Sequence, residues 1–284
     1  MTTRTVIATL ELAKRTVYSG TSEAASMPAS YLSHPQPKRR WRAPSLSQIE
    51  VYLDMTAGLA AYQQTGILTY RYLFPLYGSA TRAATHEMWI GPTRTSVGST
   101  ATASWYSGVQ SYWRSLDNDL ARFPRRHSVI DVGSQRTEPW IRYKITDPAN
   151  PDGFHDLGLL VPTPGYEPTL APMGSGPGAG VEEEVRETRS VGSARRRLHR
   201  ARERVRSYTF QAVGPTAPQE AEDQLLALQE TAGVSDPVII VDDVTATTRF
   251  MNRIVYGTLE GLQKFVLPDI YQKAQVELDV KEML

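Results

Sequence analysis

Short segments of this chain alternate apolar and polar residues with a period of two. In Ile49–Asp54 the apolar side chains fall on one face of an extended segment, and Glu50, Tyr52 and Asp54 fall on the other. This is the pattern of a half-buried β-strand. Leu68–Leu76 and His86–Ile90 also predict strands, with polar residues between them. Short strands divided by turn residues predict a β-sandwich or jelly roll.

Residues 140–160 predict a strand, a tight turn and a second strand. In Trp140–Thr146 isoleucine and tyrosine alternate with charged or polar residues, as in a half-buried strand. A turn follows at Asp147–Gly153, because its two prolines fix φ and Gly153 readily adopts a positive φ. We expect this segment to form the closing hairpin at the edge of the sandwich.

A change of composition at residues 162–180 predicts a domain boundary. This stretch holds five prolines and five glycines, which favour turns and linkers. We therefore divide the chain into residues 1–165, a β-sandwich with an N-terminal arm, and residues 166–284, an α+β domain. Residues 1–35 should supply an opening strand and then the extended arm. Residues 92–104 should form a long loop, and residues 105–123 a further strand and turn.

The C-terminal part combines one main helix with several strands. Pro218–Ala232 predicts the helix, because acidic residues occupy its first turn and an apolar stripe follows. Gly233 should end the helix with a positive φ. Pro237–Asp242 predicts a buried strand, and residues 250–256 and 275–280 predict two more. The expected fold class is mainly β, with an N-terminal jelly roll and a C-terminal α+β domain.

Nine arginines are concentrated in one charged segment. Clustered arginines neutralise phosphates, so one interpretation is a nucleic-acid contact. Glutamates lie among them, however, and no aromatic residue is interleaved before Tyr208. The segment fits either a helix with an apolar face at Ala194–Val205 or a strand in which alternate residues are basic. We favour a solvated or subunit-facing hairpin over a nucleic-acid site. The arginines are Arg186, Arg189, Arg195, Arg196, Arg197, Arg200, Arg202, Arg204 and Arg206.

The composition excludes several classes of chemistry. The net charge is +1, which gives no global attraction to nucleic acid or anionic membranes. The chain has no cysteine, and this excludes disulfides, thiolate metal sites and cysteine nucleophiles. The N-terminus lacks an apolar signal, and no segment approaches the roughly 20 apolar residues of a membrane span. We therefore expect a soluble protein that is synthesised in the cytoplasm.

No segment predicts a catalytic or ligand-binding site. Asp147, Asn150 and Asp152 resemble part of a calcium loop, but Gly158 stands where a bidentate glutamate is needed, so we favour a structural turn. Asp242–Asp243 is also interpreted as a turn, because neighbours on a strand point to opposite faces. Nucleophile, phosphate-loop and dinucleotide motifs are absent. We predict no catalytic, cofactor-binding or metal-binding residue and no enzymatic activity. The five histidines, which show no metal-ligand spacing, are His34, His86, His127, His155 and His199.

All five tryptophans lie in the first 140 residues. Exposed tryptophans would form platforms for sugars, whereas buried ones would anchor the sandwich core or an interface. We favour the core and interface interpretation. The tryptophans are Trp41, Trp89, Trp105, Trp113 and Trp140.

Several short motifs carry a family resemblance. Trp41-Arg42 precedes a strand that ends at Leu53-Asp54-Met55, and Leu73–Gly78 leads into Met88–Gly91. With residues 140–160 as closing strands, these motifs resemble the galactose-binding, discoidin-like jelly roll of phage tail proteins. That family ends the strand in Asp-Leu-Gly, so Met55 is a departure.

The C-terminal order of elements is similar to that of structural proteins at the tail tip of long, non-contractile-tailed phages. The matching elements are the arginine-rich hairpin, Tyr208–Phe210, the helix, the buried strand, Arg253–Gly257 and Val276–Leu278. The resemblance implies a virion protein of the tail tip that assembles as a homo-oligomeric ring. This ring would be an adaptor between the tail tube and the hub or fibres. It implies no cofactor, no nucleic-acid partner and no membrane partner.

Two other functions compete with this one. In the first, the sandwich is a module that binds a host-surface carbohydrate through exposed tryptophans. An enzyme acting on host polysaccharide needs two facing carboxylates, and the sequence identifies no such pair.

Overall fold

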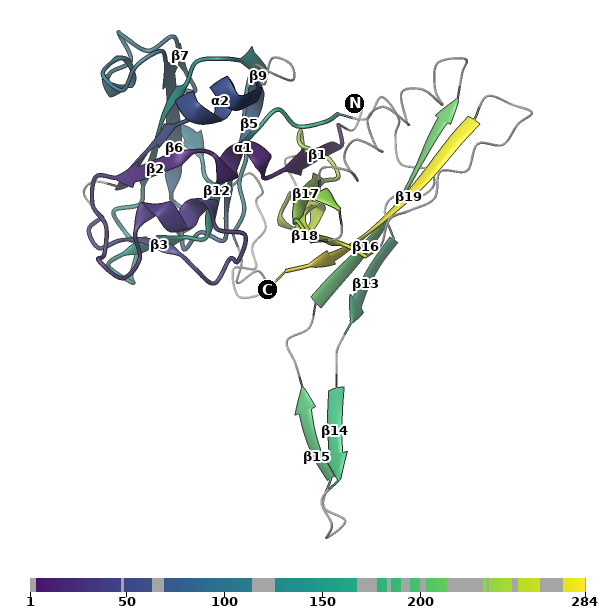
Figure 1. Ribbon diagram of the computed structural model, residues 1–284. Helices are drawn as coiled ribbons and strands as arrows, with labels where there is room; N and C mark the ends of the chain where they lie inside the picture. The colour runs from purple at the N-terminus through teal and green to yellow at the C-terminus, as the bar shows by residue number, and fades with distance from the viewer. Residues whose placement is uncertain are drawn as a thin grey trace. The chain divides into compact units, whose positions relative to one another are not determined.

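The computed structural model describes residues 4–46, 49–62, 69–113, 126–167, 178–182, 185–189, 195–199, 203–213, 232–233, 235–246, 250–260 and 273–283. The chain divides into two compact units (Figure 1). Unit 1 comprises Met1–Glu167 and Ile240–Ile254, and unit 2 comprises Pro168–Ile239 and Val255–Leu284.

Unit 1 is built mainly from short strands. Its elements are β1 (Val6–Thr9), α1 (Glu11–Lys14), β2 (Val17–Gly20), η1 (Ala29–Ser33), β3 (Trp41–Ala43), β4 (Ile49–Asp54), α2 (Thr56–Tyr62), β5 (Tyr70–Leu76), β6 (Thr85–Gly91), η2 (Ser96–Gly98), β7 (Trp105–Tyr106), β8 (Gln110–Ser111), β9 (Ile130–Arg136), β10 (Trp140–Thr146), β11 (His155–Leu157), β12 (Leu159–Thr163) and α5 (Phe250–Arg253).

These strands form two main sheets. The larger has the order β2-β4-β10-β6-β7, with β8 also paired to β6, and the smaller has the order β12-β5-β9. The short strands β11 and β3 pair separately. Consecutive strands change sheet repeatedly: β4, β6 and β10 belong to the larger sheet, whereas β5, β9 and β12 belong to the smaller. This connectivity places both sheets around one interior.

The core of unit 1 contains side chains from both sheets. Val51 of β4, Ile141 of β10 and Ile90 of β6 are fully buried in the same cluster as Leu73 of β5 and Ile130 of β9. The alternating pattern of Ile49–Asp54 is reproduced, with every second residue buried. Burial of apolar area between two sheets is the main stabilising term of such a fold. The predictions of a mainly β protein and of a sandwich are confirmed.

The expected hairpin at residues 140–160 is wrong, although its strands are present. Trp140–Thr146 forms β10 with the predicted alternate burial, and Gly153 has a φ of 71° in the turn. Strand β10 lies inside the larger sheet, between β4 and β6, and is not an edge. The turn carries the chain to β11 and β12, which pair with β3 and β5. A local pattern specifies the strands and the turn, but the partners of each strand depend on distant residues.

The expected extended arm at residues 1–35 is also replaced by packed structure. After β1 the chain forms α1, β2 and η1. Leu12, Ala29 and Leu32 are buried in the core of unit 1, and Tyr18 donates its hydroxyl to the Leu160 carbonyl over 2.7 Å. The alternation in this segment is weak, but its apolar residues still reach the core. The segment is therefore an integral part of unit 1.

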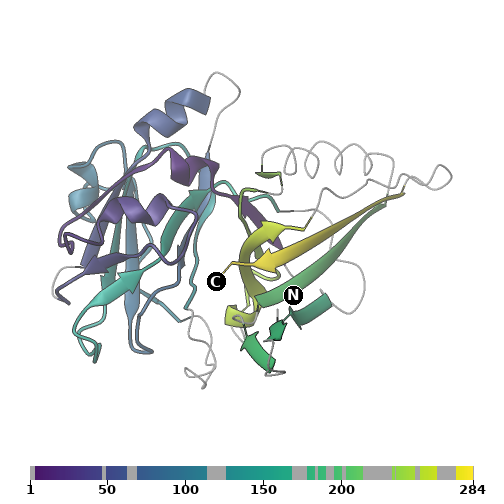
Figure 2. The same cartoon turned by 60° about the horizontal axis from the view of Figure 1, so that its bottom comes forward.

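Unit 2 contains antiparallel strands, of which β16 and β19 are the longest, with 11 and 10 residues. They are β13 (Gly178–Glu182), β14 (Val185–Arg189), β15 (Arg195–His199), β16 (Glu203–Val213), β18 (Ile254–Leu259) and β19 (Lys273–Glu282). The pairing order is β18-β19-β16-β13, while β14 and β15 pair with each other. Strands β16 and β19 lie side by side along their length (Figures 1 and 2). The buried strand predicted at Pro237–Asp242 is confirmed as β17 (Val238–Val241).

Two expectations for the C-terminal part have different outcomes. Residues 250–256 do not form one strand, because Phe250–Arg253 is the short helix α5 and β18 begins at Ile254. The predicted helix Pro218–Ala232 lies outside the described residues except for its last position. Gly233 has the predicted positive φ, at 56°.

Candidate functional site

A cluster of charged side chains joins Arg4, near the start of unit 1, to Glu167, the last residue of the unit's first segment. Arg4 donates two hydrogen bonds to Glu167, at 2.8 and 3.1 Å, one to the Tyr72 hydroxyl at 2.6 Å and one to Asp131 at 3.2 Å. Arg71 pairs with Asp131 at 2.9 Å and with Glu167 at 2.8 Å. Two guanidinium groups thus balance two carboxylates. This geometry indicates a structural role, because each of these charged groups already has an oppositely charged partner.

The same cluster shifts the pKa values of its members. Burial raises the pKa of Asp131, but hydrogen bonds from Arg71 and the Gly133 N–H, with the charges of Arg71 and Arg4, outweigh burial and lower it overall. For Glu167, burial likewise raises the pKa, but the hydrogen bonds from Arg4 and Tyr72, with the charges of Arg4 and Arg71, together lower it overall. Both carboxylates therefore stay ionised. In this form they can keep the ion pairs that hold Arg4 and Glu167 together.

Backbone hydrogen bonds also join these two segments of the chain. Ile7 and Tyr166 exchange two hydrogen bonds, Ile7 N–H to the Tyr166 carbonyl at 2.8 Å and Tyr166 N–H to the Ile7 carbonyl at 2.6 Å. No local sequence pattern predicts the contact between Arg4 and Glu167, because 163 positions separate the two residues.

The outer face of the larger sheet carries an ordered row of aromatic and charged side chains. Arg142 lies 4.5 Å from the centroid of the Trp89 ring and pairs with Glu50. Trp89 stacks on Tyr106 with centroids 5.0 Å apart, and its Nε1–H donates to Thr100 over 3.2 Å. The predicted loop at residues 92–104 therefore covers Trp89, which is only 5% exposed. A covered ring offers no platform for a sugar.

The other tryptophans follow the same rule in different places. Trp41 and Trp113 are buried, and Trp105 and Trp140 are partly buried. The predicted preference for core and interface roles is confirmed for the three buried rings. Sugar binding would have to use Trp105 or Trp140.

The turn at Asp147–Gly153 is held by a buried carboxylate. Asp147 is fully buried and accepts hydrogen bonds from the Thr81 N–H at 2.8 Å, the Thr81 hydroxyl, and the Asn150 side chain at 3.2 Å. Asp152 is exposed. The predicted structural turn is confirmed, because the oxygens of Asp147 face donors of the protein itself. Within the described ranges, no group of three or more histidine or acidic side chains is placed to hold a metal ion.

A buried histidine, His155, follows this turn in the sequence. The His155 ring is fully buried, and neither of its nitrogens has a hydrogen-bond partner among the described residues. Its ring centroid is 6.5 Å from that of Tyr112, whose hydroxyl also has no partner there. Burial lowers the pKa of His155 from 6.5 to about 4, although Asp147 and Asp156 act in the opposite direction. The imidazole is therefore neutral at physiological pH.

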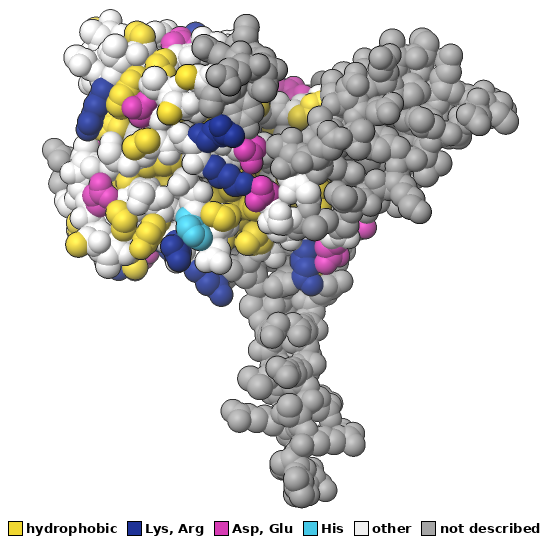
Figure 3. Space-filling model, in the orientation of Figure 1, with side chains coloured by type: hydrophobic (Ala, Val, Ile, Leu, Met, Phe, Trp, Pro, Cys, Tyr) yellow, Lys and Arg dark blue, Asp and Glu magenta, His cyan; other side chains and the backbone are white. Residues whose placement is uncertain are grey.

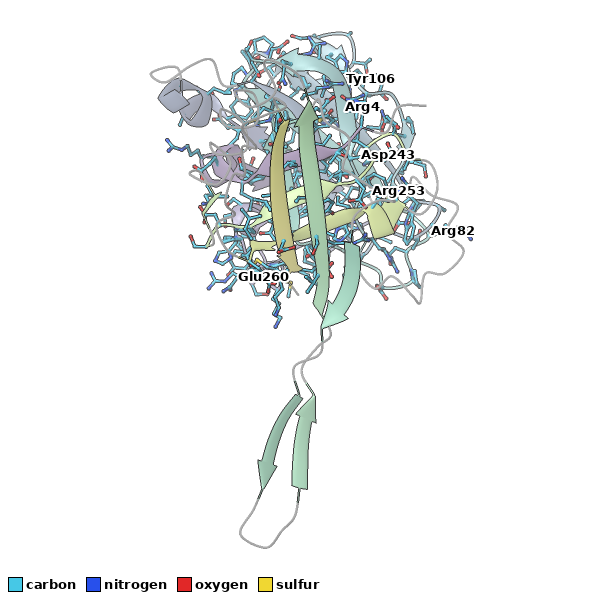
Figure 4. All side chains as sticks on the ribbon, turned by 90° about the vertical axis from the view of Figure 1, so that its right-hand side faces the viewer. Arg4, Arg82, Tyr106, Asp243, Arg253 and Glu260 are labelled. Atoms are coloured by element: carbon cyan, nitrogen blue, oxygen red, sulfur yellow. The ribbon has the colours of Figure 1, made fainter. Side chains whose placement is uncertain are left out.

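The remaining acidic pair is a turn, as predicted. The Asp243 carboxylate accepts hydrogen bonds from the Thr245 N–H at 3.0 Å and the Thr245 hydroxyl at 2.6 Å. Arg253 lies 3.4 Å from the other oxygen (Figure 4). The side chain of Asp243 thus closes its own turn and pairs with a cation, which is a local structural role.

The arginine-rich segment is a pair of strands, so the helical alternative is wrong. The pairing runs from Gly178↔Ser207 to Glu182↔Glu203 between β13 and β16, and then from Val185↔His199 to Arg189↔Arg195 between β14 and β15 (Figure 4). We call the strands β13, β14, β15 and β16 the ribbon. Both of its strand pairs are antiparallel, and alternate positions along β14 and β15 place basic residues on both faces.

One surface feature is strongly basic. Lys38, Arg39 and Arg40 are all exposed, and they lie between the buried residues Pro37 and Trp41. We call Lys38, Arg39 and Arg40 the basic turn. The sequence shows three consecutive cationic residues between Pro37 and Trp41, and this pattern could have predicted a basic surface here.

Lysine and arginine side chains gather beside a histidine in the space-filling view (Figure 3). Burial, and next the charge of Arg39, lower the pKa of His34.

No described helix is long and apolar enough to cross a membrane. No protein-family model matches the chain, and no curated protein matches it. Parts of the chain are similar to two solved structures. One is from the tail of an empty GTA particle computed with helical refinement and C6 symmetry, with 16% identity over 41% of this chain and 81% of that chain, and a TM-score of 0.25. The other is from the virion of a native gene transfer agent (GTA) particle, with 13% identity over 42% of this chain and 88% of that chain, and a TM-score of 0.25. A TM-score of 0.25 is too low for either likeness to indicate a shared fold.

Proposed function

We propose that this protein is a structural subunit of a phage-type tail. In this proposal it is a tail-tip component that assembles as a homo-oligomeric ring and connects the tail tube to the hub or fibres. The chain then works through its surfaces and not through a reaction.

The observation that carries the proposal is the ribbon. Its distal part, β14 and β15, is a two-stranded sheet with no third strand among the described residues. An isolated two-stranded hairpin is at best marginally stable in water. Such an element is best explained as one that becomes ordered against a partner, which is what a subunit of an assembly supplies.

The construction of unit 1 supports the same role. Several of its charged side chains are paired within the unit: Arg4 with Glu167, Asp147 with Thr81, and Asp243 with Thr245. These contacts stabilise the sandwich as a structural support. The short motifs that resemble phage tail proteins agree with this role.

Imaging of the virion tests the proposal. Particles that carry a small epitope at the C-terminus of this chain should bind the antibody at one end of the tail, and a reconstruction should show a ring of copies there. If the antibody and the reconstruction show that this protein is absent from the tail tip of the particles, the proposal is overturned. Purified protein that stays monomeric at high concentration and fails to assemble with tube or hub proteins would also count against it.

Carbohydrate binding by the sandwich is the second candidate from the sequence. The partly buried Trp105 and Trp140 are the side chains that would carry it. A glycan array on the wild type and on Trp105→Ala and Trp140→Ala variants tests it, and binding that is absent or unchanged by both substitutions rejects it.

A further inference from the structure

The short strand β11 is held in place by local contacts on both of its sides. On one side it forms a separate two-stranded sheet with β3, which begins at the pair His155↔Ala43. On the other side the Asp156 carbonyl accepts the Ser79 N–H over 2.9 Å, and the Asp156 N–H donates to the Ser79 hydroxyl over 2.8 Å. Neither contact belongs to the two main sheets of unit 1, so the loss of β11 leaves the pairing of those sheets intact.

Strand β3 has its own support on the edge that faces away from β11. The Arg42 N–H donates to the Met27 carbonyl over 3.1 Å, and the Arg42 carbonyl accepts the Ala24 N–H over 3.0 Å. These hydrogen bonds do not involve β11. Strand β3 therefore keeps its place when β11 moves.

The His155 side chain at the start of β11 is fully buried, and neither of its nitrogens has a partner among the described residues. In its neutral form the ring leaves one donor and one acceptor unpaired, whereas the imidazolium leaves two donors and a charge unpaired. An unpaired buried charge costs far more free energy than an unpaired neutral group. A proton on this ring is therefore strongly disfavoured while β11 stays in its packed position.

The charged groups around His155 do not remove this cost. Burial lowers the pKa of the ring to about 4; the charges of Asp147 and Asp156 raise that pKa, and the charge of Arg126 lowers it. Asp147 accepts hydrogen bonds within its own turn, and Asp156 forms a bidentate pair with Arg42 at 2.6 and 2.8 Å. Neither carboxylate hydrogen-bonds to the ring, so their attraction does not offset burial.

The His155 ring also packs against an aromatic cluster. It meets the Tyr112 ring edge-on, with centroids 6.5 Å apart, and the centroid of His86 lies 5.4 Å from that of Tyr112. The His86 Nδ1 is 3.1 Å from the Tyr143 hydroxyl. Burial raises the pKa of Tyr112, so this phenol stays neutral and supplies no negative charge to an imidazolium.

We propose that β11 is a pH-sensitive switch: protonation of His155 releases β11 from β3 and from Ser79 while the two main sheets of unit 1 stay paired. In the released form the ring reaches water and binds a proton, and this binding stabilises the released form. Release also frees the edge of β3 that had paired with β11. The inference does not depend on the proposed function, because the movement lies within unit 1.

The direction and size of the pH effect follow from the state of the ring. The packed form binds the proton only near pH 4, whereas the released form binds it near the ordinary histidine value of 6.5. The released fraction therefore rises as the pH falls below 6.5 and levels off below about 4. Between pH 7 and pH 5 the ratio of released to packed molecules should increase about 20-fold.

Hydrogen exchange at single amides of the full-length protein tests the switch. The Ser79 and Asp156 amides report the release of β11, because their hydrogen bonds join it to the neighbouring segment. The Tyr143 amide, in β10 between β4 and β6, reports unfolding of the larger sheet. After correction for the intrinsic effect of pH on exchange, the opening constant at Ser79 and Asp156 should rise about 20-fold between pH 7 and pH 5.

Low concentrations of urea distinguish release of β11 from unfolding of the whole unit. The opening constant at Ser79 should change little with urea, because a local opening exposes little surface. Tyr143 should exchange more slowly and respond steeply to urea. Equal protection and equal urea dependence at Ser79 and Tyr143 would show that β11 leaves only when the unit unfolds, and would overturn the inference.

Two replacements test the role of the ring itself. His155→Leu and His155→Gln should abolish the pH dependence at the Ser79 and Asp156 amides, whereas His34→Gln should keep most of it. A pH dependence that survives both His155 replacements would overturn the inference. An opening constant in the wild type that stays the same between pH 7 and pH 5 would overturn it as well, and this measurement needs no variant to fold.

Discussion

Replacement of His155 by leucine should remove much of the acid sensitivity of unit 1. In the folded protein the imidazole is buried without a hydrogen-bond partner among the described residues, and burial lowers its pKa from 6.5 to about 4. The unfolded chain therefore binds a proton between these pH values that the folded chain does not bind. Since the unfolded state binds more protons in this window, stability rises with pH through it.

The size of the effect follows from the two pKa values. The contribution of His155 is constant above pH 6.5 and is lost progressively as the pH falls toward 4. With a folded pKa of about 4, the loss is about 2 kcal/mol between pH 7 and pH 5. This is a large share of the roughly 5–15 kcal/mol that stabilises a typical domain. At neutral pH, His155→Leu should be neutral or slightly stabilising, because it removes polar atoms that are buried without partners.

Urea unfolding followed by tryptophan emission measures this, because all five tryptophans belong to unit 1. The wild type should lose stability between pH 7 and pH 5, and His155→Leu should lose about 2 kcal/mol less. His155→Gln, which keeps a polar side chain that does not titrate, should show the same reduced slope. His34→Gln is the comparison: burial also lowers the pKa of His34, but that ring is only partly buried, so its removal should reduce the slope less than either His155 variant does.

One result would refute the reasoning. If the wild type and both His155 variants lost stability equally between pH 7 and pH 5, the ring would not be buried in its neutral form. A variant that is less stable at pH 7 but has an unchanged pH slope would indicate a packing role alone.

Two further predictions concern the packing of unit 1. Arg4→Met leaves Glu167 without its bidentate partner and should lower the free energy of unfolding by about 1–2 kcal/mol. Arg40→Met, at an exposed position, should have no measurable effect in urea unfolding. Equal effects of Arg4→Met and Arg40→Met would contradict a stabilising role for the Arg4–Glu167 pair. Gly78→Ala places a Cβ against the Tyr112 hydroxyl and should destabilise the unit by about 1–3 kcal/mol. Adding Tyr112→Phe should restore most of the loss, and a double-mutant cycle with no coupling would exclude this collision.

The candidate interaction surfaces were predictable to different degrees. The strand pattern of Arg204, Arg206 and Tyr208 was visible in the sequence, but its helical alternative fitted the same residues until the pairing of β16 excluded it. The contact between Arg4 and Glu167 has no local pattern, because it depends on the chain returning to the same place after 163 residues. The covering of Trp89 by the 92–104 loop spans only 11 positions, but the alternation of the strand does not indicate which way the following loop folds.

The sequence by itself determined the local elements of this protein. Period-two alternation defined β4 and β10, and the prolines with Gly153 defined the turn after β10, because these depend on short-range sterics and on which face is apolar. Only the tertiary structure decided that β10 lies between β4 and β6, and that residues 1–35 pack into the core. Strand partners and burial are set by contacts between distant segments, and a local pattern fits several such arrangements equally well.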